Sequence, residues 1–132
     1  MSQSSVARSI HAPLASIDGW AITTPTLVSA VGEIIARAAR AESFTVFTLN
    51  LDHVVKLRRD AAFRAAYRSA SVVTADGAPI VWLSRRQGAN LTRTTGADLV
   101  LPLVDAAAAH QIPIYLYGST GGTLAKAARS FV

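Results

Sequence analysis

An aspartate followed by a glycine, Asp76-Gly77, comes directly after a short run of β-branched and small residues, Val72–Ala75. A carboxylate at the end of a strand can act as a general base toward the hydroxyl group of a sugar or of water. A glycine at the next position lets a ligand approach the backbone closely. Asp-Gly is also common in plain turns. Spacing alone leaves two interpretations of Asp76, a catalytic base and a turn residue, and it favours the turn.

Two polar side chains, Thr48 and Asn50, flank Leu49 at the end of another apolar run, Phe44–Leu49. Alternate residues of a strand point to the same face, so both side chains could hydrogen-bond one ligand. Asn50 could equally cap a helix that begins at Leu51, because an asparagine side-chain oxygen accepts from free N–H groups of the first turn. The sequence does not distinguish these two roles.

A third candidate is the segment Gly118–Gly122, which follows the apolar run Ile112–Tyr117 and precedes an alanine-rich stretch. Backbone N–H groups at a strand-to-helix turn of this kind can hold a phosphate group. The segment has neither the G-x-G-x-x-G pattern of dinucleotide-binding folds nor the G-K-[ST] of a Walker loop. An ordinary turn is the alternative, and spacing alone favours it.

Several other chemistries lack the residues that they need. The three histidines, His11, His53 and His110, are not at metal-ligand spacing, and no Asp-x-Asp sequence is present to hold Mg²⁺ or Mn²⁺. The G-x-S-x-G sequence of serine hydrolases is absent. The chain has no cysteine, which excludes disulfide scaffolds and thiol catalysis and fits a reducing compartment. We therefore expect no metal and no other cofactor.

The candidate residues lie where strands and helices alternate along the chain. Alternation of this kind implies βαβ units and a parallel sheet, and ligands bind beyond the carboxyl ends of its strands. We therefore expect a Rossmann-like α/β domain whose sheet is mainly parallel. The expected elements are a hairpin at 16–22, strands at 44–49, 72–75 and 112–117, and helices from Thr24-Pro25 to about 41, at 50–70 (one or two), at 78–86, at 96–110 and from about 123.

Length and composition indicate one folded domain. The chain has 132 residues, of which 51% are hydrophobic, which is too apolar for a disordered chain. Residues 1–13 are polar and unpatterned, so we expect a flexible leader followed by a domain over 14–132. The last helix begins shortly before Val132, so we expect the domain to be truncated at its C-terminus. No run approaches the roughly 18 apolar residues of a membrane-spanning helix, and we expect a cytoplasmic protein.

The charge is basic, with 13 Lys and Arg residues against 8 Asp and Glu residues and a net charge of +5. A basic chain is expected to meet an anionic partner, such as nucleic acid, acidic lipid or a phosphorylated ligand. One helical stretch carries five cations, which we interpret first as a solvated face and next as a contact with an acidic membrane. Nucleic acid comes last, because no aromatic residues are interleaved for stacking on bases. The five are Lys56, Arg58, Arg59, Arg64 and Arg68.

Four segments, read in order, carry a family resemblance: FTVFTLNLDHVVKLRRD, ASVVTADGAPIVWLSRRQG, LTRTTGADLVLPLVDAAAAHQIPIYLYGSTGG and the alanine-rich stretch that follows. They resemble the WecG/TagA/CpsF family of bacterial glycosyltransferases (glycosyltransferase family 26). The pattern of that family has T-x-N at a strand end, a strand ending in Asp-Gly, an arginine shortly before G-x-D-L, and a strand followed by a Gly-rich turn. The matching residues here are Thr48 and Asn50, Asp76 and Gly77, Arg93 before Gly96–Leu99, and Gly118 onward.

The resemblance implies an inverting, metal-independent hexosyl or N-acetylhexosaminyl transferase of exopolysaccharide biosynthesis. Such an enzyme moves a sugar from a UDP-sugar to an undecaprenyl-pyrophosphate-linked saccharide, and it lies peripherally on the inner face of the cytoplasmic membrane. By resemblance, Asp76 is the general base for the acceptor hydroxyl, and Arg93 meets pyrophosphate or acceptor charge. The substrate-binding residues that the resemblance implies are Thr48, Asn50, Gly77, Arg93 and Gly118. It also implies that this chain is the N-terminal portion of the family's domain, so we expect the chain by itself not to catalyse transfer.

Two other functions stay open at this point. One is a non-catalytic, truncated α/β module that binds a nucleotide or a partner, and the other is a basic nucleic-acid binder. A sheet that stops short exposes an unpaired edge, so we also expect the chain to self-associate.

Overall fold

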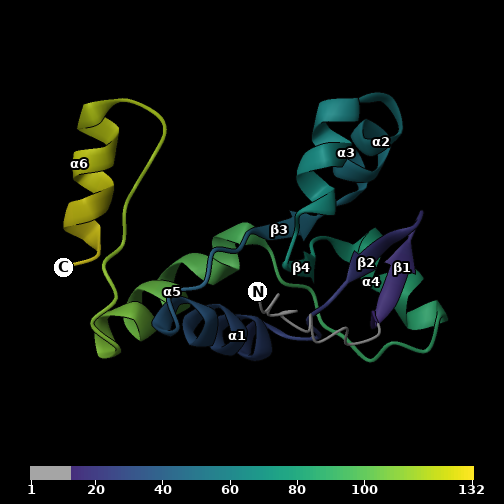
Figure 1. The fold of residues 1–132 in the computed structure, drawn as a ribbon, viewed down its shortest axis with the longest axis horizontal. Helices are drawn as coiled ribbons and strands as arrows, with labels where there is room; N and C mark the ends of the chain where they lie inside the picture. The colour runs from purple at the N-terminus through teal and green to yellow at the C-terminus, as the bar shows by residue number, and fades with distance from the viewer. Residues whose placement is uncertain (1–12) are drawn as a thin grey trace, which may run out of the picture.

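The computed structural model describes residues 13–132, and its first two strands form a hairpin (Figure 1). Strand β1 (Ala15–Ile17) pairs antiparallel with β2 (Trp20–Ile22), and Ile17 lies opposite Trp20. The two turn residues, Asp18 and Gly19, both have positive φ, at 53° and 84°, as the type I′ hairpin turn requires. The hairpin expected at 16–22 is confirmed. The leader expected over residues 1–13 lies outside the described residues, apart from Pro13.

Helix α1 (Leu27–Ala39) begins two residues after the position that Thr24-Pro25 predicts. Its N-cap is Thr26, which forms a capping box with Ser29. Thr24 is buried instead, and the N–H groups of Thr23 and Thr24 both donate to the carbonyl of Val73. The expected cap was wrong because these tertiary hydrogen bonds hold residues 23–24 beside the next sheet, before the helix begins.

That sheet is one βαβ unit. Strand β3 (Val46–Leu49) leads through α2 (Leu51–Arg59) and α3 (Ala61–Arg68) to β4 (Val72–Ala75), and β3 and β4 pair in parallel, with Thr48 opposite Thr74. Asp60 separates the two helices, since its side chain accepts from the N–H of Phe63 and caps α3. The parallel pairing, the strand at 72–75 and the helices within 50–70 are therefore confirmed.

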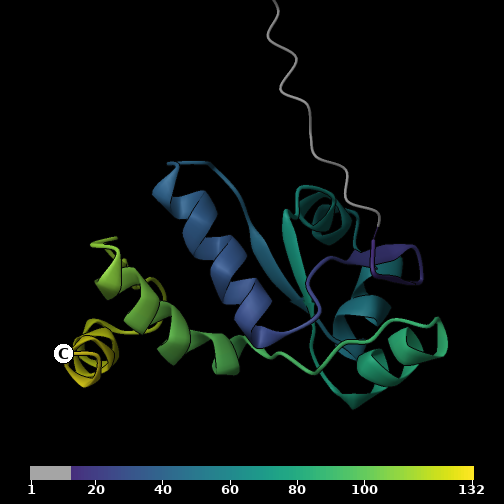
Figure 2. The same cartoon turned by 90° about the horizontal axis from the view of Figure 1, so that it is seen from below.

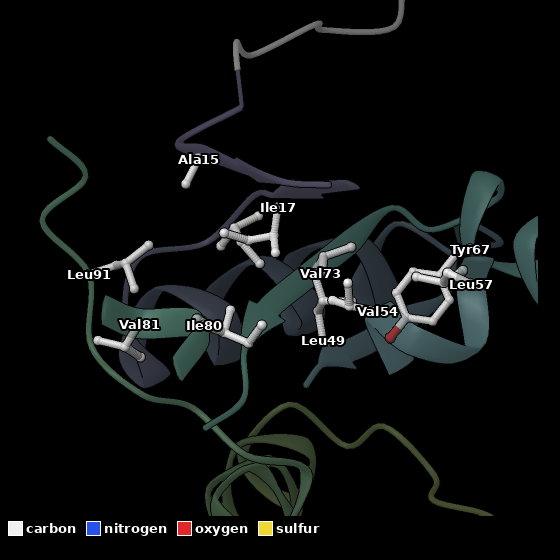
Figure 3. Close-up of a cluster of buried hydrophobic side chains, with 12 residues drawn as sticks. Ala15, Ile17, Leu49, Val54, Leu57, Tyr67, Val73, Ile80, Val81 and Leu91 are labelled. Carbon is white, nitrogen blue, oxygen red and sulfur yellow. The ribbon is translucent and has the colours of Figure 1, made fainter. Parts of the chain in front are cut away.

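Side chains of β4 are buried on both faces of this sheet. On one face, Val73 packs in a cluster with the hairpin, α2, α3 and α4 (Ala78–Arg86), which Figure 3 shows around Ile80, Leu49 and Ile17. On the other face, Val72 packs with Ala30 and Ile34 of α1 and with Leu99 of α5 (Gly96–Ala109). The small sheet is thus the middle layer of the fold.

The strand expected at 112–117 is absent from the structure, and that expectation was wrong. Residues 112–117 are irregular, and Tyr115 and Tyr117 are 90% and 95% exposed. A strand needs a neighbouring edge to pair with. Helix α5 instead carries the chain away from β3 and β4 and toward α6 (Gly121–Ser130), which lies beyond α5 on the side away from the strands (Figures 1 and 2).

The architecture is therefore mixed α/β, with one two-stranded parallel sheet and one two-stranded antiparallel sheet. The sequence predicts a mainly parallel, Rossmann-like sheet, and the described residues contain one parallel pair of that kind, β3–β4. Within residues 13–132, no helix combines the length and the apolar character that crossing a membrane would need.

Candidate active site

Asp76 stands at the carboxyl end of β4, where it is half-buried. Its N–H donates to the carbonyl of Leu49 at 2.9 Å, which continues the parallel pairing by one residue and fixes the position of Asp76 beside the end of β3. Among the described residues, no hydrogen bond or ion pair engages its carboxylate. The carboxylate is thus held at the edge of the sheet without a partner that would compete for a proton.

Gly77 occupies a backbone conformation that requires glycine. It has φ 104° and ψ 152°, and it is the N-cap residue of α4 without making any side-chain cap. Space is not the constraint, because a Cβ atom here would meet only Pro79 Cδ at an ordinary 3.8 Å. A side chain at this φ and ψ would be strained, so Gly77 turns the chain sharply and leaves the backbone beside Asp76 without a covering side chain.

The side chains of Thr48 and Asn50 have different neighbours in the structure. The Thr48 side chain lies against the N-terminus of α5, where a Cβ atom built on Gly96 would stand 3.8 Å from its Oγ1 atom. The Asn50 Oδ1 atom accepts from the N–H of His53 at 2.8 Å and caps α2, as one of the two interpretations from sequence holds. The amide nitrogen of Asn50 has no hydrogen-bond partner among the described residues, which leaves a donor for a ligand.

Arg93 is exposed in the linker between α4 and α5, and both of its neighbours are anchored. The N–H of Thr92 donates to Pro25 at 2.8 Å, and the N–H of Thr94 donates to Ala75 at 2.8 Å. The carbonyl of Thr94 also accepts from Thr74 Oγ1. The linker therefore runs beside the end of β4, and its hydrogen bonds place the backbone of Arg93 near the same edge as Asp76.

The linker also supplies the capped start of α5. Thr95 and Asp98 form a capping box, and the hydrogen bonds from Thr95 lower the pKa of Asp98, to which the positive charge of Arg93 adds. Asp98 is thus ionised at neutral pH, and its carboxylate stays on the N-terminal turn of the helix, next to Arg93.

Gly118 does not join this group of residues. It has φ 117° and is exposed in the turn before α6, whose N-cap is Thr120. That turn lies beyond α5, away from the ends of β3 and β4 (Figure 1). The structure therefore brings Thr48, Asn50, Asp76, Gly77 and Arg93 to the carboxyl edge of the parallel sheet and leaves Gly118 apart.

The structure adds a contact between a partly buried histidine, His53, and a buried tyrosine, Tyr67, that the sequence did not predict. The Tyr67 hydroxyl lies 2.6 Å from His53 Nδ1 and 3.4 Å from the carbonyl of Thr48, and its ring stacks on Phe47 with 4.6 Å between ring centroids. Burial raises the pKa of Tyr67 to about 12, and the charge of Asp76 adds to that rise. The two side chains therefore lie beside the carboxyl end of β3, where the charge of Asp76 influences the titration of Tyr67. The two residues lie 14 positions apart on different helices, so no local signal in the sequence links them.

Three of the five cations on α2 and α3 have contacts within the chain. Arg58 pairs with Asp18 of the hairpin at 2.8 Å, Arg64 donates to the carbonyl of Leu57, and the Lys56 ammonium lies 4.5 Å from the centre of the Phe63 ring. These contacts stabilise the fold. The side chains of Arg59 and Arg68 make no contact of these kinds with the described residues. The same 120 residues contain no cluster of three or more potential metal-ligating side chains.

The chain was compared with solved structures and with protein-family models. No solved structure matched the chain. Residues 15–132 match the glycosyl transferase WecG/TagA/CpsF family model, which spans every element from β1 to α6. The chain therefore belongs to the WecG/TagA/CpsF family of glycosyltransferases.

Proposed function

We propose that residues 14–132 form the N-terminal portion of an inverting, metal-independent glycosyltransferase of exopolysaccharide biosynthesis. Its donor is a UDP-sugar that carries a hexose or an N-acetylhexosamine. Its acceptor is an undecaprenyl-pyrophosphate-linked saccharide, and the protein lies peripherally on the inner face of the cytoplasmic membrane. Family membership supports glycosyl transfer, and the arrangement at the sheet edge supports the roles below.

Asp76 is the general base in this proposal. Its carboxylate takes the proton of the acceptor hydroxyl while the acceptor oxygen attacks the anomeric carbon of the donor. The bond between that carbon and the diphosphate oxygen breaks, and UDP leaves with the electron pair, so the configuration at carbon inverts. The observation that carries the proposal is the placement of Asp76, at the carboxyl end of β4 with no described partner for its carboxylate and with the bare backbone of Gly77 beside it.

The neighbouring residues bind and orient the substrates. The Asn50 amide nitrogen and the Thr48 hydroxyl are donors toward sugar oxygens, and the Gly77 backbone admits the acceptor close to Asp76. Arg93 meets the negative charge of a pyrophosphate, which a guanidinium can contact with two parallel hydrogen bonds. Gly118 is expected to act in substrate binding only if α6 moves toward the sheet edge, since this structure holds it elsewhere.

The experiment uses the protein expressed with any residues that follow Val132 in its reading frame. Release of UDP is measured with a panel of UDP-sugars and a lipid-pyrophosphate saccharide analogue, with and without a chelator. We expect release that depends on the acceptor and persists when divalent cations are removed. Loss of activity on chelation would contradict metal independence, and binding of UDP-sugars without any transfer would instead indicate a non-catalytic module.

A further inference from the structure

One edge of the parallel sheet is open, and the hydrogen bonds identify which one. The carbonyls of Thr45 and Leu49 accept from N–H groups of Val72 and Asp76, so the odd-numbered residues of β3 face β4. Val46 and Thr48 must therefore direct their N–H and C=O groups to the opposite side, since backbone groups alternate along a strand. Among the described residues, only the Thr48 carbonyl finds a partner there, the Tyr67 hydroxyl at 3.4 Å.

The outer edge of β4 is closed by contrast. Val73 accepts from Thr23, and Ala75 accepts from Thr94. The open edge of β3 also lacks the usual protection against pairing with another strand, because Val46–Leu49 contains neither a proline nor a charged residue. It is a short, uncharged, parallel edge that can accept another strand.

A segment with strand character lies unpaired elsewhere in the same chain. Ile112–Tyr117 is rich in β-branched and aromatic residues, yet its only backbone hydrogen bond among the described residues is from the N–H of Ile112 to Ala107 at 2.8 Å. Tyr115 and Tyr117 are almost fully exposed, and Ile114 is 49% exposed. The segment borders an apolar groove of about 520 Å³ that it forms with α5 and α6, lined among others by Val104, Ile112, Leu116, Leu124 and Phe131.

We propose that two copies of this chain associate by strand addition, in which residues 112–117 of one copy pair in parallel with the open edge of β3 in the other. A second copy is the occupant because α5 starts beside β3, and each chain's own segment follows the opposite end of that helix, away from β3 (Figures 1 and 2). The pairing would satisfy the backbone groups of Val46 and the N–H of Thr48, and it would bury the exposed tyrosines. It would also place the interface directly beside Thr48, at the candidate active site.

The area available is of the size that a stable interface needs. One buried tyrosine removes about 150–250 Å² from water, so Tyr115 and Tyr117 together contribute about 400 Å². A reciprocal exchange buries this area and the edge that receives it in both copies, which comes to about 800 Å² per partner, the ordinary size of a specific interface. The charge of +5 on each copy opposes association, so added salt should strengthen the dimer by screening that repulsion.

The chain has no cysteine, so single introduced cysteines give a direct test. Val46→Cys and Tyr115→Cys proteins carrying different mass tags are mixed and treated with a short bismaleimide cross-linker. We expect a cross-linked heterodimer of the two tagged chains. The matched control is Val28→Cys on α1, which is 82% exposed and should give no such product with Tyr115→Cys.

Light scattering at tens of micromolar measures the association itself. We expect a dimer for the unmodified chain, and dimerisation about tenfold weaker for the double variant Ile114→Pro/Tyr115→Pro. Neighbouring N–H groups of a strand point to opposite sides, so this variant removes an N–H that faces β3 in either register. A monomer throughout would overturn the proposal, and so would a dimer that Ile114→Pro/Tyr115→Pro leaves unchanged. A cross-link formed only within single chains of the double variant Val46→Cys/Tyr115→Cys would show that the chain's own segment is the occupant, which also overturns it. None of these outcomes depends on whether the protein transfers sugar.

Discussion

Replacing Asp76 by asparagine tests the proposed base with little disturbance of the fold. The backbone N–H of Asp76 keeps its bond to Leu49, and its side chain makes no described hydrogen bond, so we expect a stability change within about 0.5 kcal/mol. An amide cannot take the acceptor proton. Removing a general base slows transfer by roughly 10²–10⁴-fold. At about 1.4 kcal/mol per factor of ten, this is a rise of roughly 3–6 kcal/mol in the activation barrier.

The assay is acceptor-dependent release of UDP, in the protein expressed with any residues that follow Val132. Asp105→Asn, at an exposed position on α5, is the matched control and should leave the rate unchanged. A second measurement needs only the 132-residue chain. Because the charge of Asp76 contributes to the raised pKa of Tyr67, Asp76→Asn should lower that pKa from about 12, while burial keeps it above 10. The ultraviolet absorbance of tyrosinate, followed against pH, reports this shift.

Two results would refute the reasoning, at different points. Unchanged transfer in Asp76→Asn would return Asp76 to the role of a turn residue. An unchanged Tyr67 titration would show that Asp76 does not lie where the structure puts it. Slow transfer together with a lowered Tyr67 pKa is the expected combination.

Three further predictions concern stability and activity. Tyr67→Phe keeps the stack on Phe47 but loses the bond to His53, so we expect about 0.5–1.5 kcal/mol lower stability in urea. Since the folded-state pKa of Tyr67 lies above its ordinary value of 10, the stability that the neutral hydroxyl contributes is complete below pH 10 and is lost as the pH rises through 12. The difference in unfolding free energy between wild type and Tyr67→Phe should therefore shrink over that range. A constant difference would contradict this prediction. Gly77→Ala should lower the free energy of unfolding by about 1–3 kcal/mol because Gly77 has a positive φ. Gly32→Ala in α1, where a Cβ atom meets nothing within 4 Å, should raise it by about 0.5–1 kcal/mol. Thermal unfolding measures both changes. The 132-residue chain by itself should show no acceptor-dependent UDP release, because Arg93 alone at the sheet edge is too little to stabilise a leaving diphosphate; release that depends on both acceptor and Asp76 would contradict this.

The sequence by itself determined the elements whose signals are local. Asp18-Gly19 needs only its own backbone conformation to turn a hairpin, and the buried run Val72–Ala75 and the helix Ala78–Arg86 both appear with the expected bounds. The resemblance to the WecG/TagA/CpsF family also came from sequence, through residues spaced along the chain, and the family match confirms it.

Only the tertiary structure decided what depends on distant partners. Thr24 is a residue type that often caps helices, but hydrogen bonds to the carbonyl of Val73, 49 residues away, hold it beside the sheet instead. Ile112–Tyr117 has the composition of a strand, but a strand exists only where an edge is within reach, and α5 carries this segment away from the open edge of β3. The contact between Tyr67 and His53 likewise arises from the packing of α3 against α2. Composition sets what a segment can form, and the hydrogen-bond partners that the rest of the chain brings near decide what it does form.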